Sequence, residues 1–191
     1  LRMENYNSLC SWSGGKDSCF ALLRVIEQGY RPAVLLNVLN EEGRISRSHG
    51  IPEAILKAQA AAAALPIHLI ASSWQDYGLQ FTTALRRLKQ QYDLNYVVFG
   101  DIDLQAHRDW EEKVCANAGI TAILPLWQQD RKDLVQQMLN GGIKTIIVSC
   151  NELMGPDFLG RQLDTHCIQD LETLGVDVCG ENGEFHTLVL D

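Results

Sequence analysis

The chain has 191 residues, of which 46% are hydrophobic, and its 24 acidic and 16 basic residues give a net charge of −8. This length suits one well-packed core, or a core with a small appendage. Apolar runs stay well below the roughly 20 residues of a membrane helix, and no Lys/Arg-rich run offers a bulk electrostatic grip on nucleic acid. We therefore expect neither a membrane nor a nucleic acid as a partner.

The spacing of the cysteines indicates the cellular compartment of the protein. The six cysteines are scattered along the chain, and no Cys-x-x-Cys pair occurs. Such pairs are typical of zinc knuckles, and denser cysteine frameworks are typical of secreted disulfide-rich proteins. The first residues also lack the apolar segment of a secretion signal. We therefore predict free thiols in a cytoplasmic protein. The sequence leaves the oligomeric state open, a dimer included.

Strand-like and helix-like segments alternate along most of the chain. Strands are predicted at 8–12, 33–39, 67–71, 96–99, 121–124 and 145–149, and helices at 16–28, 53–64, 75–91, 107–118 and 132–139. This alternation implies right-handed crossovers and a parallel α/β sheet with helices on both faces. After Cys150, glycines and Pro156 interrupt the pattern, which indicates a small C-terminal α/β subdomain. We predict a larger domain at 1–127 and a smaller C-terminal subdomain at 128–191.

The segment SGGKDS lies at Ser13–Ser18, between the first predicted strand and the first predicted helix. Ligands bind such sheets beyond the carboxyl ends of the strands, and the free N–H groups of the next helix favour an anion. The segment is not a Walker loop, because Cys10 replaces its first glycine and Asp17 follows the lysine. Adjacent glycines, two hydroxyls and a cation predict a phosphate-binding loop. The alternative is a tight turn without a ligand.

A second polar segment lies near the end of the chain. Glu181 and Glu184 flank the dipeptide Asn182-Gly183, which is a turn signal, and an apolar strand-like run follows. Considered alone, two acidic residues beside a turn are more typical of a solvated surface than of a site.

Several segments resemble a known family. The SGGKDS segment resembles the pyrophosphate loop of the ATP pyrophosphatase (PP-loop) superfamily. Segments similar to those of its diphthine–ammonia ligase family follow in the same order: FGDIDLQAHRDWEEKVC at 99–115, LPLW at 124–127, FLGRQLD at 158–164 and CGENGEFHTLVLD at 179–191. The chain is therefore identified as a member of that family. The loop at Ser46–Gly50 is closer to the family's bacterial, adenine nucleotide α-hydrolase-like branch.

The resemblance implies a HUP-type, Rossmann-like sheet and an ATP-dependent amide ligase that releases AMP and pyrophosphate. ATP would adenylate an acceptor carboxylate, and ammonia, arriving as ammonium, would convert the adenylate to an amide, with Mg²⁺ as cofactor. Elongation factor 2 would be the acceptor only in an archaeal or eukaryotic source. A PP-loop tRNA-modifying enzyme and a non-catalytic ATP- or AMP-binding regulatory protein remain the alternatives.

The resemblance also implies that the domain at 1–127 binds ATP and that the subdomain at 128–191 serves substrate and ammonia, and it implies residue roles. The loop residues Ser13, Gly14, Gly15, Lys16, Asp17 and Ser18 would hold the pyrophosphate. Lys16 would also act in catalysis, and Asp17 is the candidate metal ligand. Asn37, Val38, His49, Gly100 and Asp101 are predicted to contact ATP, and Arg108, Asn182, Gly183, His186 and Thr187 to contact substrate. Glu181 and Glu184 are predicted to attract ammonium and to take its proton.

Three of these assignments have simpler alternatives. His49 could be a surface-loop histidine, and Asp101 could be a helix N-cap rather than a contact to ribose, metal or ammonium. Arg108 could form an ordinary i,i+4 pair with Glu112 on a helix instead of holding an acceptor carboxylate. The four tryptophans are assigned to packing.

Overall fold

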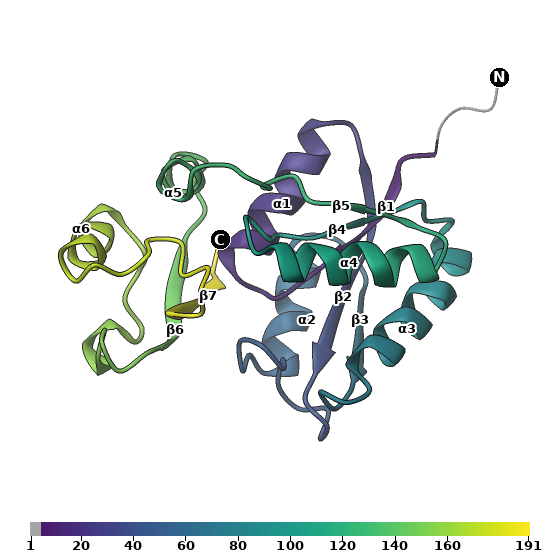
Figure 1. The fold of residues 1–191 in the computed structure, drawn as a ribbon, viewed down its shortest axis with the longest axis horizontal. Helices are drawn as coiled ribbons and strands as arrows, with labels where there is room; N and C mark the ends of the chain where they lie inside the picture. The colour runs from purple at the N-terminus through teal and green to yellow at the C-terminus, as the bar shows by residue number, and fades with distance from the viewer. Residues whose placement is uncertain (1–4) are drawn as a thin grey trace.

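The computed structural model describes residues 5–191, which contain a five-stranded parallel sheet of order β3-β2-β1-β4-β5 (Figure 1). The strands are β1 (Asn7–Ser11), β2 (Arg31–Leu39), β3 (Ile67–Ala71), β4 (Tyr96–Val98) and β5 (Thr121–Ile123). The connecting helices are α1 (Lys16–Glu27), α2 (Glu53–Ala62), α3 (Tyr77–Tyr92) and α4 (Gln105–Asn117). Every strand pairing in this sheet is parallel, which confirms the predicted α/β class.

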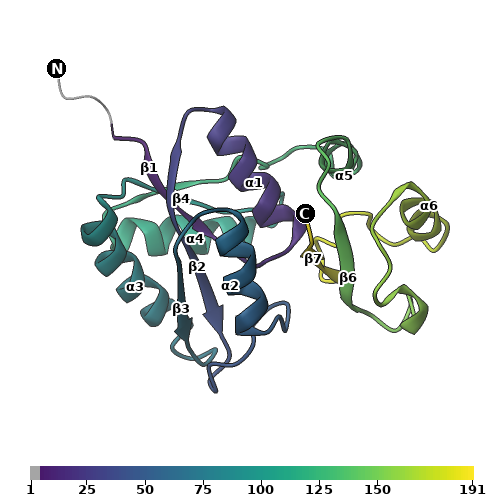
Figure 2. The same ribbon diagram turned by 180° about the vertical axis from the view of Figure 1, so that it is seen from behind.

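Helices cover both faces of the sheet (Figures 1 and 2). Side chains of neighbouring strand residues point to opposite faces, so Leu9 and Cys10 of β1 enter two different cores. Cys10 packs in a core with Phe20 of α1, and Leu9 packs in a core with Phe81 of α3. The near-continuous apolar run of β2 follows from this double burial.

The chain beyond the sheet forms α5 (Arg131–Asn140), β6 (Thr145–Cys150), a short 3-10 helix η1 (Pro156–Phe158), α6 (Thr165–Thr173) and β7 (Phe185–Val189). The alternating pattern implied that the strand at 145–150 continues the parallel sheet, and this is wrong. β6 pairs antiparallel with β7 in a separate two-stranded sheet. The partner of β6 thus comes from the end of the chain, which strand–helix alternation cannot indicate.

The C-terminal elements share a hydrophobic core with the sheet. Leu134 of α5, Ile147 of β6, Leu171 of α6 and Phe185 of β7 are buried in the same cluster as Cys10 of β1. These elements lie beside α1, at one side of the sheet (Figure 1). The division of the chain at residue 127 stays a prediction, since the cluster is continuous across that position.

Two further expectations concern the whole chain. Within residues 5–191, no helix is both long and apolar enough to cross a membrane. All six cysteines are free, as predicted.

Candidate active site

A cavity of about 980 Å³ lies at the carboxyl ends of β1, β2 and β4, and the turn before β7 closes one side of it. Ligands of open α/β sheets bind at this edge. Ligand pockets span about 300–1,000 Å³, so the volume is large enough for a nucleotide together with a second group. Fourteen predicted site residues line it: Ser13, Lys16, Asp17, Ser18, Asn37, Val38, His49, Gly100, Asp101, Glu181, Asn182, Gly183, His186 and Thr187.

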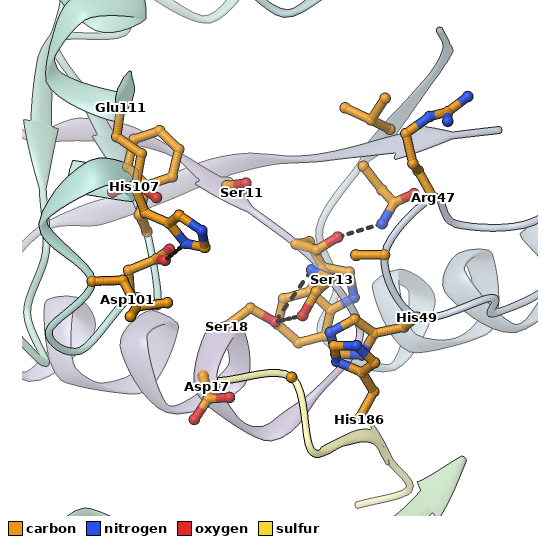
Figure 3. Close-up of a pocket in the computed structure, with 18 of the residues that line it drawn as sticks. Ser11, Ser13, Asp17, Ser18, Arg47, His49, Asp101, His107, Glu111 and His186 are labelled. Carbon is orange, nitrogen blue, oxygen red and sulfur yellow. Dashed lines mark hydrogen bonds and ion pairs between the residues drawn. The ribbon is translucent and has the colours of Figure 1, made fainter. Parts of the chain in front are cut away.

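The SGGKDS segment forms a closed loop that ends in the first turn of α1. Ser13 Oγ lies 3.0 Å from Ser18 Oγ and accepts a hydrogen bond of 3.2 Å from the Gly15 backbone N–H (Figure 3). Gly15 is the N-cap of α1 and offers no side-chain cap; Thr187 Oγ1 accepts from the Lys16 N–H, and among residues 5–191 no side chain accepts from the N–H groups of Asp17 and Ser18. Uncapped N–H groups at a helix start carry partial positive charge, so the loop is suited to an anion.

Both glycines of the loop are required by its surroundings. Gly14 has a φ of +84°, which favours glycine. A Cβ on Gly15 would lie 2.6 Å from His49 Cε1 and 3.0 Å from the Thr187 carbonyl oxygen. The glycines do not themselves line the cavity. They allow the loop to pack against its neighbours while its donors face inward.

The last strand fixes the loop from outside. The Lys16 N–H donates to Thr187 Oγ1 at 3.0 Å, and the Val189 N–H donates to the Gly14 carbonyl at 2.9 Å. Gln59 Nε2 of α2 donates to the same Gly14 carbonyl at 3.0 Å and to the Val189 carbonyl at 2.9 Å. The loop is therefore held by α2 and β7 as well as by its own turn.

Lys16 lies beneath the loop and is almost fully buried, with 4% of its side chain exposed. Its Nζ donates to both Asp17 carboxylate oxygens, at 3.0 and 2.8 Å, and to the Cys179 carbonyl. Burial opposes the charged form, but the Asp17 carboxylate and further acidic groups outweigh it, and the pKa of Lys16 is raised. The side chain is thus a fixed ammonium at the cavity wall.

Two histidines line the cavity beside the SGGKDS loop. The rings of His49 and His186 lie 4.4 Å apart, and His49 Nδ1 is 3.1 Å from the Thr187 carbonyl oxygen. Burial, together with the neighbouring His186, lowers the pKa of His49 to about 4. Burial also lowers the pKa of His186. Both rings are therefore neutral at pH 7, and His49 belongs to the cavity rather than to an exposed loop.

Glu181 enters the cavity from the turn that precedes β7. Its Oε1 accepts a hydrogen bond of 3.0 Å from the Ile102 N–H. Burial raises the pKa of Glu181 to about 7, and the charges of Asp17 and Asp101 add to this effect. A carboxyl group with this pKa changes its protonation state near neutral pH, as a general base needs to.

Asn37, near the end of β2, lines the cavity with an acceptor that lacks a partner. Its Nδ2 donates to the Trp12 carbonyl at 2.7 Å, whereas its Oδ1 is buried without a hydrogen-bond partner among residues 5–191. A buried oxygen without a partner is costly, so a ligand N–H donor fits here. The neighbouring Val38 also lines the cavity.

Four predicted residues do not line the cavity: Gly14 and Gly15 of the loop, and also Glu184 and Arg108. Glu184 turns back to its own turn, where its carboxylate accepts from the Asn182 N–H at 3.1 Å. Arg108 donates to Glu112 at 2.7 Å, four residues along the same helix, and its guanidinium lies 5.0 Å from the Trp127 ring. The structure therefore does not bring Glu184 and Arg108 together with the other site residues, because local partners hold both side chains, and their roles stay predictions.

The structure adds residues that the sequence did not single out. These cavity residues are Arg47, Trp74, Tyr77, His107, Trp110 and Glu111. Trp74 is 69% exposed, so its assignment to packing was wrong. Glu111 did leave a signal in the sequence, because it precedes the buried residues Val114 and Cys115 by three and four positions. An acidic residue on the buried stripe of a helix needs a partner or a function.

Gly100 brings the end of β4 against the phosphate loop. A Cβ on Gly100 would lie 2.8 Å from the Asp17 carbonyl carbon and 2.9 Å from the Ser18 nitrogen. These are backbone atoms, so no change of rotamer relieves the contact. Gly100 therefore has a structural role in addition to its predicted contact with ATP, since only glycine permits this close approach of the two backbones.

We expect Gly100→Ala to destabilise the fold by about 1–3 kcal/mol through overpacking. Urea denaturation of the purified variant measures this change. The control is Gly78→Ala in α3, where a Cβ would meet its nearest neighbour, Trp110 Nε1, at 3.7 Å. Alanine in this helix should be neutral or slightly stabilising. Equal midpoints for the wild type and Gly100→Ala would contradict the close approach.

Comparisons with known proteins identify the family of the chain. Residues 6–122 match the profile described as diphthamide synthase N-terminal domain, and residues 130–191 match the diphthamide synthase C-terminal domain. The diphthine–ammonia ligases of Mus musculus and Homo sapiens are each 27% identical to the chain, over 94% of this chain and 76% of theirs. The ligase of Schizosaccharomyces pombe is 30% identical, over 94% of this chain and 33% of that protein.

Among solved structures, a predicted subunit of tRNA methyltransferase from Methanocaldococcus jannaschii is similar, with a TM-score of 0.48 and 16% identity over 96% of each chain. The two family profiles together span nearly the whole chain, on both sides of the cavity. The chain therefore belongs to the diphthamide synthase family, which contains the diphthine–ammonia ligases.

Proposed function

We propose that this protein is an ATP-dependent amide ligase that adenylates an acceptor carboxylate and then amidates it with ammonia. The main support is one arrangement: the donors of the SGGKDS loop and the carboxyl group of Glu181 line the same cavity. A phosphate and a group that accepts protons from an attacking amine would thus meet at one place. The names of the relatives, which are diphthine–ammonia ligases, point to the same chemistry.

The phosphate loop would act on the leaving pyrophosphate. The hydroxyls of Ser13 and Ser18 and the N–H groups of α1 that follow Lys16 would supply hydrogen-bond donors, and Lys16 supplies a fixed positive charge. Transfer of an adenylyl group asks the protein mainly to align the groups and to neutralise the charge that develops. These donors are held in place by β7 and α2, so they require little rearrangement.

The nucleoside would lie on the side of Asn37. Its buried Oδ1 without a partner fits an amino group of the base, and Val38 adds an apolar contact. His49 and His186 would border the phosphates as neutral rings, which donate and accept hydrogen bonds without adding charge.

The residues present fit Mg²⁺ only as an ion that arrives with ATP. Within residues 5–191, no group of three or more His, Cys, Asp or Glu side chains could hold a metal. Both oxygens of Asp17 accept from Lys16, so Asp17 would contact the ion through water. Mg²⁺ is often bound through one or two carboxylates together with substrate phosphates, and it would neutralise phosphate charge.

The second step would use Glu181. Its carboxylate would take a proton from the attacking nitrogen, and its pKa of about 7 suits this task at neutral pH. The acceptor would be diphthine on elongation factor 2 if the source makes this residue, and another carboxylate if the chain belongs to the bacterial branch.

The reaction products test the proposal. The protein is incubated with α-labelled ATP and ammonium chloride, with and without cell extract as a source of acceptor. We expect AMP and pyrophosphate, because the loop departs from the Walker pattern at Cys10 and Asp17. Chromatography separates AMP from ADP. ADP as the main product would overturn the proposed α–β cleavage, and tight ATP binding without turnover in any extract would favour a regulatory protein.

A further inference from the structure

The cavity extends beyond the phosphate loop into a second half with aromatic walls. Its rings are those of Trp74, Tyr77, Phe81, Phe99 and Trp110. Tyr77 and Phe81 each lie 5.4 Å from Trp110, measured between ring centroids. This half is therefore bounded by aromatic rings, whose π-systems attract a cation and offer little to a phosphate.

A buried carboxyl group lies within these walls. Glu111 of α4 is only 4% exposed, and its Oε2 is buried without a hydrogen-bond partner among residues 5–191. Asp101 and His107 lie beside it, on the side of the cavity opposite Arg47, His49 and His186 (Figure 3). A buried carboxyl oxygen without a donor is rare in folded proteins, so it indicates that something else supplies the donor.

The acidic groups around Glu111 favour the binding of a cation at this position. Burial raises the pKa of Glu111 to about 11, and the hydrogen bond with Asp101 and the charge of Glu181 add to this effect. Asp101 accepts from His107 Nδ1 at 2.7 Å. Burial would raise the pKa of Asp101, but the hydrogen bonds with His107 and Glu111 outweigh it and lower this pKa. In the empty cavity, a proton on Glu111 thus takes the place of a positive ligand.

We propose that Asp101 and Glu111, walled by Tyr77 and Trp110, form an ammonium-binding subsite of the cavity. The four N–H donors of ammonium match the oxygens of the two carboxyl groups, and the aromatic faces supply cation–π attraction. A divalent metal is disfavoured, since no group of three ligating side chains exists in the described part of the chain. The catalytic use of this subsite rests on the proposed function, whereas the binding of ammonium does not.

The proton balance of the subsite can be written in full. Binding of ammonium displaces the proton of Glu111 to solvent. The bound ammonium then returns one proton to the Glu111 carboxylate and becomes ammonia. Its lone pair forms a C–N bond with the acyl carbon of the adenylate, and the C–O bond to AMP breaks, with its electron pair remaining on the phosphate oxygen. The second proton passes from nitrogen to the Glu181 carboxylate. No oxidant or reductant is needed.

Ammonium itself is the probe for the test. The line width of isotope-labelled ammonium chloride in proton-detected NMR at mildly acidic pH reports binding, because a bound ion tumbles with the protein. We expect the wild type to broaden the signal and Glu111→Gln to weaken binding at least about tenfold, the effect of one lost charge-assisted hydrogen bond. Glutamine has the shape of the protonated acid, so the variant should fold.

A matched control is Glu112→Gln, whose side chain pairs with Arg108 outside the cavity. It should broaden the signal as the wild type does. Asp101→Asn is the second variant at the subsite and should also weaken binding. Unlabelled methylammonium as a competitor separates free ammonium from the amino group of a larger ligand, since a site for the free ion should favour ammonium.

Each outcome is informative. No broadening by the wild type, or equal broadening by Glu111→Gln, overturns the subsite. Stronger competition by methylammonium than by unlabelled ammonium also overturns the assignment to the free ion. Release of AMP without ammonium binding would leave the proposed function standing and remove only the subsite. Ammonium binding in a protein that forms ADP would leave the subsite standing and overturn the proposed function.

Discussion

Replacing Lys16 with methionine is expected to weaken ATP binding by about tenfold to a hundredfold. A charge-assisted contact to phosphate contributes about 1.5–3 kcal/mol, which corresponds to this range. The variant also leaves the Asp17 carboxylate without its partner, which adds repulsion toward the triphosphate. Methionine keeps the stem of the side chain near the Phe185 ring, 5.6 Å from Nζ in the wild type. Isothermal calorimetry with ATP and Mg²⁺ measures the change.

Two variants separate this effect from general damage. Lys57→Met removes an exposed cation of α2, 60% exposed and paired with Glu53, and should bind ATP normally. Lys16→Met combined with Asp17→Asn should recover part of the affinity, because it removes the repulsion but not the lost contact. Unchanged affinity in Lys16→Met, with circular dichroism like that of the wild type, would show that Lys16 only anchors the Cys179 turn.

Glu181→Gln should reduce amide formation by about 10²–10⁴-fold, the usual contribution of a general base. ATP binding should persist, because Glu181 reaches the cavity from the turn before β7 and not from the phosphate loop. In the wild type, the rate should rise with pH through about 7, since burial raises the pKa of Glu181 and only its ionised form accepts a proton. The variant should lose this rise. The readout is amide and AMP release across pH.

The matched control is Glu184→Gln, three residues along the chain. Its side chain accepts from the Asn182 N–H and does not line the cavity, so the variant should turn over normally. Equal losses in both variants would indicate that the turn as a whole positions the site. A normal rate in Glu181→Gln would make the carboxyl pair of Asp101 and Glu111 the next candidate for the base.

Sequence patterns predicted the sheet well because its strands are buried on both faces. The apolar run of β2 and the glycine pair before α1 are local features, and local features are visible in a sequence. The pairing of β6 with β7 is different. It joins Thr145 to Val189, and nothing within either segment specifies the other. α6 is short and follows a region interrupted by glycines, so its apolar face gave only a weak signal.

Within the site, residue types were easier to predict than side-chain directions. Glu181 and Glu184 look equivalent in the sequence, but backbone direction separates them, since Glu181 accepts from Ile102 and Glu184 accepts from Asn182. Arg108 matched a family segment and still pairs with Glu112, because a partner one helical turn away is always within reach. Glu111 was missed because its cavity forms only when α3 and α4 pack together.

The contacts between the phosphate loop and the last strand bear on how the protein is made. Lys16 and Thr187 are 171 positions apart, so a ribosome must synthesise the chain through Thr187 before this contact can form. The parallel sheet can assemble earlier from the emerging N-terminal part, since domains generally fold as units during synthesis. A nascent chain that lacks β7 has the SGGKDS sequence without the outer support of its loop. The support of the proposed ATP site is therefore complete only after β7 has been synthesised and docked.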